Sequence, residues 1–443
     1  MSLFSRIVLV GGGIFSLVAA LMLGKGEGEI VIIEGDPKEQ GISFRRGVPQ
    51  GNHIHQLSAA ALIELEKLIP NLGEMLDKLG VPKVIWGTKD TQILFQDGEM
   101  LSQDNPIGIV TRNMTRPLLE YILRAAVLEQ GNVTFIGKHR VIDLIRDGNS
   151  SRVTGVRYIE MPGNSSQPEK SITADYVVVG TGNDAWVNWL MNMHYPEPKK
   201  RVLNAGLTYM TADFKGVTLT AKMIGAADTL ENPRGGVIME HEHGLIKATG
   251  YEYQMKGDIP ETQAEYLRFL ESVDPRLSDQ LQGATLVGKV HKVRPCLSRV
   301  WELEEALWPE GLLIGGSAHA LFNPKYGQGM KVAIDQAKIV REAIQHELTS
   351  YEFRQKLMQV VKIPWLLASM ADVRQMRNFD PRSVPNATKV EKVMQFYIDS
   401  LEKSDNKTRD MVVATFLRIA QLETSFATLF RPKIVAAFVK TLL

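Results

Sequence analysis

Cysteine is almost absent from this chain: Cys296 is the one thiol among 443 residues. A single cysteine excludes an internal disulfide framework and is typical of proteins from reducing compartments, so we expect a cytoplasmic location. Cys296 lies in KVRPCLSRVW, without the cysteine or histidine neighbours of a metal site or a thiol enzyme. This context favours a buried or idle thiol.

An excess of charge of one sign is also lacking. The 51 basic and 50 acidic residues are evenly mixed and leave a net charge of +1, which argues against a nucleic-acid partner. The nine histidines show no metal-ligand spacing. His53 and His55 share one side of an extended segment without further ligands, so we predict structural hydrogen bonds and no metal site. No acid–base pair stands out, and the catalytic residues stay unassigned.

The N-terminal segment has the order strand, glycine turn, helix, strand and acid. The apolar run Ile7–Val10 leads into three glycines, a helical stretch follows, and the apolar run Ile30–Ile33 stops at Glu34. Glycine lets a diphosphate approach the helix N-terminus closely, and the acid can bind a ribose hydroxyl. The segment therefore predicts a dinucleotide site made by Gly11, Gly13 and Glu34.

Two features set this segment apart from the usual fingerprint. Ser16 stands where G-x-G-x-x-G has its third glycine, and a serine still permits close packing of helix on strand. Residues 7–24 also form an uncharged run of 18 residues, long enough for a transmembrane or signal segment. The glycines in its middle, and the strand and acid that follow, argue against that alternative.

Apolar periodicity divides the rest of the chain into further helices and strands. We predict helices over 57–80, 116–129, 261–272 and 329–347, an antiparallel meander over 133–173, short buried strands over 176–179 and 312–314, and a second sheet from strands within 203–254. Beyond residue 350 the pattern is mostly helical. Residues 411–443 are rich in apolar side chains, which predicts a packed helical tail, with peripheral membrane contact as the alternative.

A second glycine-rich turn lies far downstream, in residues 311–337. A short apolar strand ends in Gly315-Gly316-Ser317, and the turn Pro324-x-x-Gly327-x-Gly329 then opens a helix at Met330. This arrangement would place another set of backbone N–H groups at a helix N-terminus, suited to a negatively polarised ring edge or a phosphate.

Together these motifs resemble the FAD-dependent aromatic-hydroxylase superfamily of flavin monooxygenases, and most of all its polyether epoxidase branch of the lasalocid and monensin type. Four further segments carry the likeness: RRGVPQGNHIH at 45–55, TRPLL at 115–119, ADYVVVGTG at 174–182 and WPEG at 308–311. The matches run in order from residue 7 to about residue 340, and the helical tail lies outside them.

The resemblance implies an α/β fold like that of para-hydroxybenzoate hydroxylase, with a Rossmann-like FAD domain, an interleaved β-sheet substrate domain and a helical C-terminal tail. The expected bounds are 1–200 with 290–348, then 201–289, then 349–443. The expected cofactor-binding residues are Gly11, Gly13, Ser16, Glu34, Arg46, Arg116, Ser317, Pro324, Gly327, Gly329 and Met330. The ADP half of FAD would lie at Glu34, its polar middle at the arginines, and its ring at Pro324–Gly329.

Four positions depart from the family pattern. Besides Ser16, Val179 and Ser317 stand where we align the aspartates of the D-x-x-G and G-D motifs, and Asn183 replaces an arginine. Each lost charge-assisted contact could cost about 1.5–3 kcal/mol of FAD binding. We therefore expect FAD to bind more weakly than is usual for this family.

By resemblance, the chain would be an FAD-dependent monooxygenase that epoxidises or hydroxylates a lipophilic natural product, a polyketide, an isoprenoid or an aromatic compound, through a flavin C4a-hydroperoxide. O2 would be the second substrate. NAD(P)H would visit transiently or act through a separate reductase, because only one nucleotide fingerprint is present. Two alternatives stay open: an isoprenoid reductase or cyclase of the geranylgeranyl reductase type, and a redox-silent flavoprotein-like scaffold. The oligomeric state is open as well.

Overall fold

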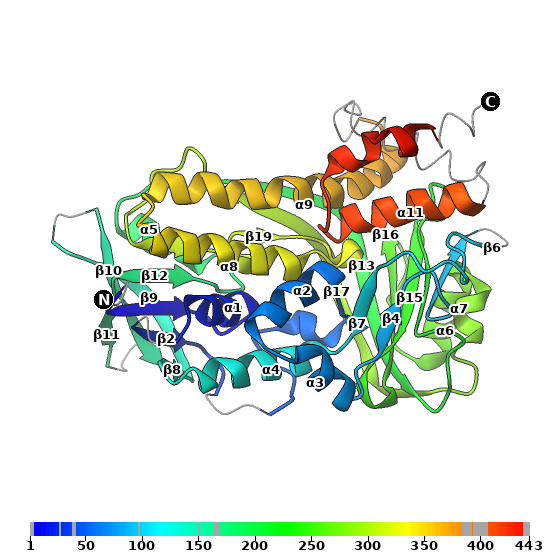
Figure 1. Cartoon of the computed structure of the whole chain (residues 1–443), viewed down its shortest axis with the longest axis horizontal. Coiled ribbons are helices and arrows are strands. Elements are labelled where there is room, and N and C mark those ends of the chain that lie inside the picture. Colours follow the sequence, from blue (N-terminus) through cyan, green and yellow to red (C-terminus); the bar gives the residue numbers. More distant parts are fainter. Residues whose placement is uncertain are drawn as a thin grey trace.

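The computed structural model describes residues 4–436, apart from 26–27, 38–40, 96–97, 149–150, 163–167, 383, 385–391 and 393–405. It contains both helices and strands, and the predicted α/β class is confirmed. Two large sheets lie side by side, a parallel one at the N-terminal end and a mostly antiparallel one (Figure 1).

The first sheet has five parallel strands. Its order is β18 (Leu312–Ile314), β12 (Tyr176–Val179), β1 (Arg6–Val10), β2 (Glu29–Ile33) and β8 (Val133–Ile136). These strands are near-continuous apolar runs, as expected for a parallel sheet that is covered on both faces. Helices α8 (Gly329–Gln345) and α9 (Ser350–Phe379) lie above it in Figure 1, and α4 (Arg116–Glu129) lies below.

The strand register brings the carboxyl ends of the sheet into line. Val10 pairs with Val179 on one side and with Ile33 on the other, and Val179 pairs with Ile314. The glycine turn after β1 therefore lies next to the residues that follow β2, β12 and β18. Ligands of open parallel sheets bind at this edge, where strand order reverses on either side of the first strand.

Helix α1 (Ile14–Leu23) follows the glycine turn, and all ten of its residues are buried. It packs against α8 and α4 in the interior of the nucleotide fold. The uncharged run at residues 7–24 is thus a buried strand, a turn and a buried helix. No helix in the described parts of the chain is long and apolar enough to cross a bilayer.

The predicted helix over 57–80 is two helices in the structure, α2 (Ala59–Leu68) and α3 (Leu72–Lys78). Asn71, the N-cap residue of α3, adopts a left-handed conformation with φ of 60°. The chain changes direction at this residue, so α2 and α3 are separate helices. A three-stranded sheet of β3 (Gln56–Leu57), β7 (Val110–Asn113) and β4 (Lys83–Ile85) accompanies them. Of the predicted meander over 133–173, the part from residue 139 is the antiparallel sheet β9 (His139–Arg146), β10 (Val153–Glu160) and β11 (Lys170–Thr173), whereas β8 belongs to the parallel sheet.

The second large sheet has eight strands. Its order is β19 (Ala320–Leu321), β17 (Thr285–Glu302), β13 (Lys199–Lys215), β16 (Ile246–Tyr253), β15 (Arg234–Glu240), β14 (Met223–Ala226), β5 (Thr91–Phe95) and β6 (Gly98–Glu99). The expected range of 201–289 is therefore too narrow for this sheet, because it also takes strands from 91–99 and from 285–321. Strand β5 joins β14 over a long sequence separation, which local periodicity does not reveal.

Side chains alternate between the two faces of the eight-stranded sheet. Met210, Ala212 and Phe214 of β13 face the helices α6 (Gln263–Val273) and α7 (Pro275–Asp279). The opposite face carries Leu207 and Tyr209 of the same strand, with tyrosines of β16. The loop that follows β2 connects this second face to the domain of the parallel sheet, because His53 of that loop contacts Thr211 of β13.

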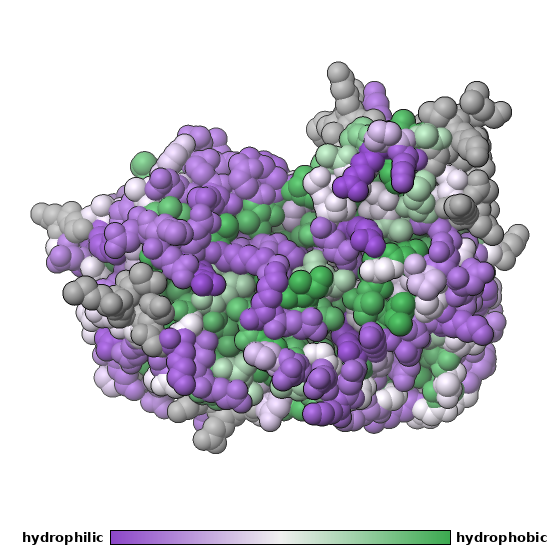
Figure 2. Space-filling model, viewed as in Figure 1, coloured by the Kyte–Doolittle hydropathy of each residue, from purple (hydrophilic) through white to green (hydrophobic). Residues whose placement is uncertain are grey.

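The C-terminal region is helical, with α9 and α11 (Asn406–Ala420). Apolar residues of α11, among them Val412, Val413 and Ile419, pack in a core with residues of the β4 region. This burial accounts for much of the apolar composition of the tail, while residues 437–443 lie outside the described part. Figure 2 shows a mostly hydrophilic face with apolar side chains gathered at its middle, around α2, where Ile63 is exposed.

Gly11 has a conformation that the glycine turn requires. Its φ is +95°, and a Cβ there would lie 2.9 Å from the carbonyl oxygen of Gly180. We expect Gly11→Ala to lower the free energy of unfolding by about 2 kcal/mol. Gly13→Ala is the control, with φ of −82° and no atom within 4 Å of the added Cβ, and it should cost less than about 1 kcal/mol. Equal urea midpoints for the two variants would contradict this account.

Candidate functional site

The glycine turn after β1 leaves the N-terminus of α1 open. Gly13 is the N-cap residue of the helix, no side chain caps it, and the first turn contains no acidic residue. A Cβ placed on Gly13 would meet no atom within 4 Å, so the space in front of the helix is free. Uncapped N–H groups with the positive end of the helix dipole make an anion site there.

The downstream turn has the same character. Pro324–Tyr326 forms a short 3-10 turn, Gly327 has φ of +65°, and Gly329 is the first residue of α8. Added Cβ atoms on Gly327 and Gly329 would meet nothing within 4 Å, and no side chain caps α8 at Gln328. Met330 differs, because its side chain is buried in the core, so only its backbone is available to a ligand.

Glu34 lies beside the first turn but is not a free carboxylate. It is 3% exposed, Arg124 donates to it at 2.5 and 3.1 Å, and Arg45 donates at 2.6 Å. A Cβ on Gly12 would lie 2.2 Å from its Oε2 atom, so the carboxylate packs directly on the turn. Burial raises the pKa of the Glu34 carboxyl, and the hydrogen bond and charge of Arg124, with the charge of Arg45, oppose that shift.

Arg45 joins this carboxylate to the turn and to helix α4. Its guanidinium donates to Asp36 at 2.9 Å, to Glu120 at 2.9 Å and to the carbonyl oxygen of Gly12 at 2.8 Å. Burial works to raise the pKa of Glu120, but the charges of Arg116 and Arg45 outweigh it and leave that pKa below its ordinary value. A buried charge network thus surrounds the ribose side of the expected nucleotide site.

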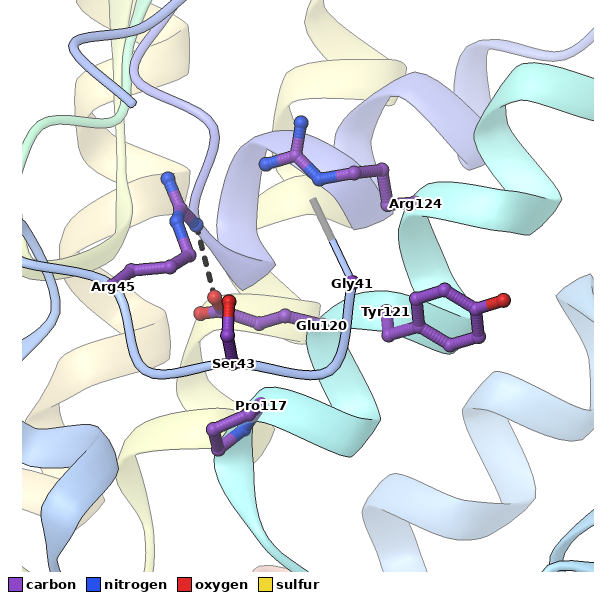
Figure 3. A pocket seen from close by; sticks show the side chains of 7 residues that line it. All are labelled: Gly41, Ser43, Arg45, Pro117, Glu120, Tyr121 and Arg124. Atoms are coloured by element: carbon purple, nitrogen blue, oxygen red, sulfur yellow. Dashed lines mark hydrogen bonds and ion pairs between the residues drawn. The ribbon is translucent and has the colours of Figure 1, made fainter. Parts of the chain in front are cut away.

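A small surface pocket opens at this network. Its lining comes from the loop after β2 and from α4: Gly41, Ser43, Arg45, Pro117, Glu120, Tyr121 and Arg124. Figure 3 shows Arg45 and Arg124 converging on it from these two elements, with the Arg45–Glu120 ion pair drawn across it.

The structure separates the two arginines that the sequence favours. Arg116 lies at the start of α4 and donates to Glu120 at 2.7 Å, next to the network. Arg46 is exposed, and its neighbour Arg45 takes the buried position. Sequence reasoning missed Arg45 and Arg124. One signal was available for the latter, since positions 116, 120 and 124 alternate in charge at a spacing of four, on one face of a helix.

Phe15 of α1 packs at the ends of β12 and β18, beside the crevice at the carboxyl ends of the parallel strands. A Cβ added to Gly315 would lie 2.2 Å from the Phe15 ring, and one added to Gly180 would lie 2.8 Å from that ring. A Cβ added to Gly316 would lie 2.9 Å from the Cβ of Phe15. These glycines therefore make room for the phenyl ring. Ser16 is fully buried, and a Cβ on Gly180 would lie 2.3 Å from its Oγ atom, so the close helix–strand packing expected of this position is present.

Ser317 lies in the 3-10 turn Gly316–Ala318 that follows β18. Its carbonyl oxygen accepts a hydrogen bond from Arg299 of β17 at 2.9 Å, which ties the turn to the eight-stranded sheet. Val179 is a buried apolar residue at the end of β12. Neither position brings a charged side chain to the crevice.

The two histidines of the 45–55 segment join the loop to the second sheet. His53 Nδ1 is 2.8 Å from the hydroxyl of Thr211, and His55 Nδ1 is 3.0 Å from the carbonyl oxygen of His53. Burial lowers the pKa of His53 to about 4 and that of His55 to about 3, so both are neutral at physiological pH. Among the described residues, no group of histidines, cysteines or acids has the arrangement of a metal site.

No family model matches this chain. A curated protein of Mycobacterium tuberculosis (strain ATCC 25618 / H37Rv), Protein Rv3254, is 26% identical over 347 residues, which is 76% of this chain and 72% of that protein. The structure of the flavin-dependent brominase Bmp2 is similar with a TM-score of 0.64 at 16% identity, over 98% of this chain and 100% of that one. The p-nitrophenol 4-monooxygenase PnpA from Pseudomonas putida DLL-E4 gives 0.61 at 14% identity, over 95% and 99%. The chain therefore has the fold of flavin-dependent halogenases and monooxygenases.

The buried position of Glu34 generates a stability prediction. Glu34→Gln would remove the charged partner of the buried Arg124 guanidinium and one of the three carboxylates around Arg45, and we expect it to lower the free energy of unfolding by about 3 kcal/mol. Glu29→Gln is the matched control from the other end of β2, where the pair with Arg6 is exposed, and it should cost less than about 1 kcal/mol. Urea unfolding of the cofactor-free protein checks both; a Glu34 variant as stable as the control would refute the role given to the network.

Proposed function

We propose that this chain is an FAD-dependent oxidoreductase of the monooxygenase type. The observation that carries the proposal is the open, uncapped glycine turn at the N-terminus of α1, with Glu34 beside it, in a fold shared with flavin-dependent monooxygenases and halogenases. A dinucleotide diphosphate is the ligand that such a turn suits best.

The backbone fits the cofactor better than the side chains do. The space beside Gly13, Gly327 and Gly329 is free, and any side chain at these positions would occupy it. Gly11–Gly13 would hold the diphosphate, Glu34 the ribose, and Pro324–Gly329 the ring. The neutral residues Val179 and Ser317, with Asn183, offer no charged support. We therefore propose that FAD binding relies on backbone N–H groups and on Arg45 and Arg116 near the diphosphate.

A bound flavin would supply the transfer of one oxygen atom from O2 to the substrate. The chain's own residues would bind and orient the substrate and keep water away. The sheet face with Leu207, Tyr209, Tyr251 and Tyr253 is apolar and aromatic, and it is buried. This surface supports a lipophilic or aromatic substrate, and we propose epoxidation or hydroxylation of such a natural product, with NAD(P)H as the reductant, directly or through a separate reductase.

Oxygen consumption tests the proposed reaction. The purified protein, loaded with FAD and reduced chemically under anaerobic conditions, should consume O2 on re-aeration and pass one oxygen atom to a polyene, isoprenoid or phenolic test substrate. Labelled product from ¹⁸O2 would support the proposal. Product formed without O2 would favour the isoprenoid reductase alternative, and a protein that takes up no FAD would favour the redox-silent scaffold.

Gly13 offers a variant that separates stability from cofactor binding. Aspartate is a good N-cap residue, so Gly13→Asp should keep or raise the thermal stability. Its carboxylate would lie where the diphosphate is proposed, and we expect FAD affinity to fall at least about a hundredfold. Gly13→Asn caps the helix without the charge and should lose much less. Fluorescence titration of FAD measures both; equal affinities for the two variants would place the diphosphate elsewhere.

A further inference from the structure

A buried polar cluster joins three parts of the fold that are distant in sequence. It consists of Asp228 after β14, Tyr253 of β16, Asn323 and Lys325 of the downstream turn, and Asp372 of α9. We call these five residues the aspartate cluster. Asp372 is 1% exposed, and Asn323 is 3% exposed. The cluster lies beside the turn Pro324–Gly329 that we propose for the flavin ring.

Asp372 binds the turn to the sheet. The hydroxyl of Tyr253 donates to its Oδ1 atom at 2.9 Å, and the amide of Asn323 donates to its Oδ2 atom at 2.7 Å. Asn323 in turn accepts a hydrogen bond from the backbone N–H of Lys325 at 3.1 Å, as the N-cap of the 3-10 turn. One carboxyl group of α9 thus fixes Asn323, the N-cap residue of the turn, against strand β16.

Asp228 holds the next part of the same turn. Its side chain forms an ion pair with Lys325, accepts from the hydroxyl of Tyr251 at 2.9 Å and accepts from the amide of Gln375 at 2.7 Å. The ammonium group also lies 5.5 and 5.4 Å from the ring centres of Tyr251 and Tyr253. Gln375 is one helical turn from Asp372, so α9 contacts the aspartate cluster at both carboxylates.

The charges of the cluster do not balance when both acids are ionised. Lys325 is the cation at the centre, and it pairs directly with Asp228, whose pKa it holds below the ordinary value against the effect of burial. Burial raises the pKa of Asp372 to about 6, and the charge of Asp228 adds to that shift. The other titratable groups that face Asp372 are neutral: burial raises the pKa values of Tyr251 and Tyr253 well above 10 and that of Cys296 of β17 to about 12.

We propose that Asp372 is a positioning residue that latches the turn Pro324–Gly329 to the tyrosine-bearing sheet face as a neutral acid and loosens it on ionisation. The sign follows from linkage: a carboxyl group that binds its proton more tightly in the latched form stabilises that form at low pH. Release is therefore favoured progressively as the pH rises from the ordinary aspartate pKa of roughly 4 to about 6, and it changes little above that. The consequence for the flavin ring rests on the proposed function, whereas the latch itself does not.

Cys296 is a built-in reporter for this latch, because it is the one thiol of the chain and is buried in the same cluster of tyrosines. Its reaction with 4,4′-dithiodipyridine can be followed in the full-length, cofactor-free protein from pH 4 to pH 8. Asp372→Asn imitates the neutral acid, with one acceptor and one donor. The ratio of wild-type to Asp372→Asn labelling rates should rise from its low-pH value by up to about a hundredfold between pH 4 and pH 6.5, and then stay level to pH 8.

Two further variants sharpen the test. Asp410→Asn is the matched control, since Asp410 is also buried and accepts from the backbone of Ser102 and the amide of Asn105, and it should label like the wild type. Tyr253→Phe removes a hydrogen bond that favours the ionised form of Asp372, so the midpoint of the labelling step should move to higher pH. A ratio that stays flat across the pH range, or an unmoved midpoint in Tyr253→Phe, would overturn the proposal.

FAD titration of the same proteins connects the latch to the cofactor. In the wild type the affinity for FAD should change by several-fold or more between pH 4 and pH 6, and in Asp372→Asn it should be constant. A labelling step without FAD uptake by any of these proteins would refute the proposed function and leave the latch standing. FAD uptake without the labelling step would refute the latch and leave the proposed function standing.

Discussion

The close packing of the first turn of α1 on the ends of β12 and β18 is the contact on which the site depends. Gly180, Gly315 and Gly316 lack side chains where the helix approaches, and Phe15 and Ser16 fill the space that they leave. This contact fixes the direction of α1, whose uncapped N-terminus then faces the edge where the parallel strands end. Every residue proposed to bind the nucleotide is placed relative to that edge.

Most of the nucleotide fold is predictable from local pattern. The strands Tyr176–Val179 and Leu312–Ile314 and the helix over 116–129 have the predicted bounds, because a continuous apolar run or an amphipathic repeat is bounded by turn residues at each end. The glycine turn was also readable, since its backbone conformation leaves few alternatives to glycine at residue 11. The assignment of the proposed site residues to FAD stays a prediction.

Contacts between distant segments were not readable. The strand Thr91–Phe95 is recruited to the second sheet by pairing with Met223–Ala226, and nothing in its own sequence marks that partner. Arg45 is the buried arginine and Arg46 is exposed, and which of these two neighbours is buried depends on the local backbone conformation of the loop. The role of Phe15 depends on three glycines from two other strands. These features are set by tertiary packing, which single-sequence periodicity does not encode.

The central claim is that FAD binds along the open turn of α1, and equilibrium titration of the cofactor-free protein with FAD tests it most directly. The account predicts saturable uptake of one FAD per chain, a shifted flavin absorption band and competition by ADP, which would share the Gly11–Gly13 and Glu34 contacts. No uptake at FAD concentrations of about 100 μM, which corresponds to a binding free energy weaker than about −5.5 kcal/mol, would contradict it.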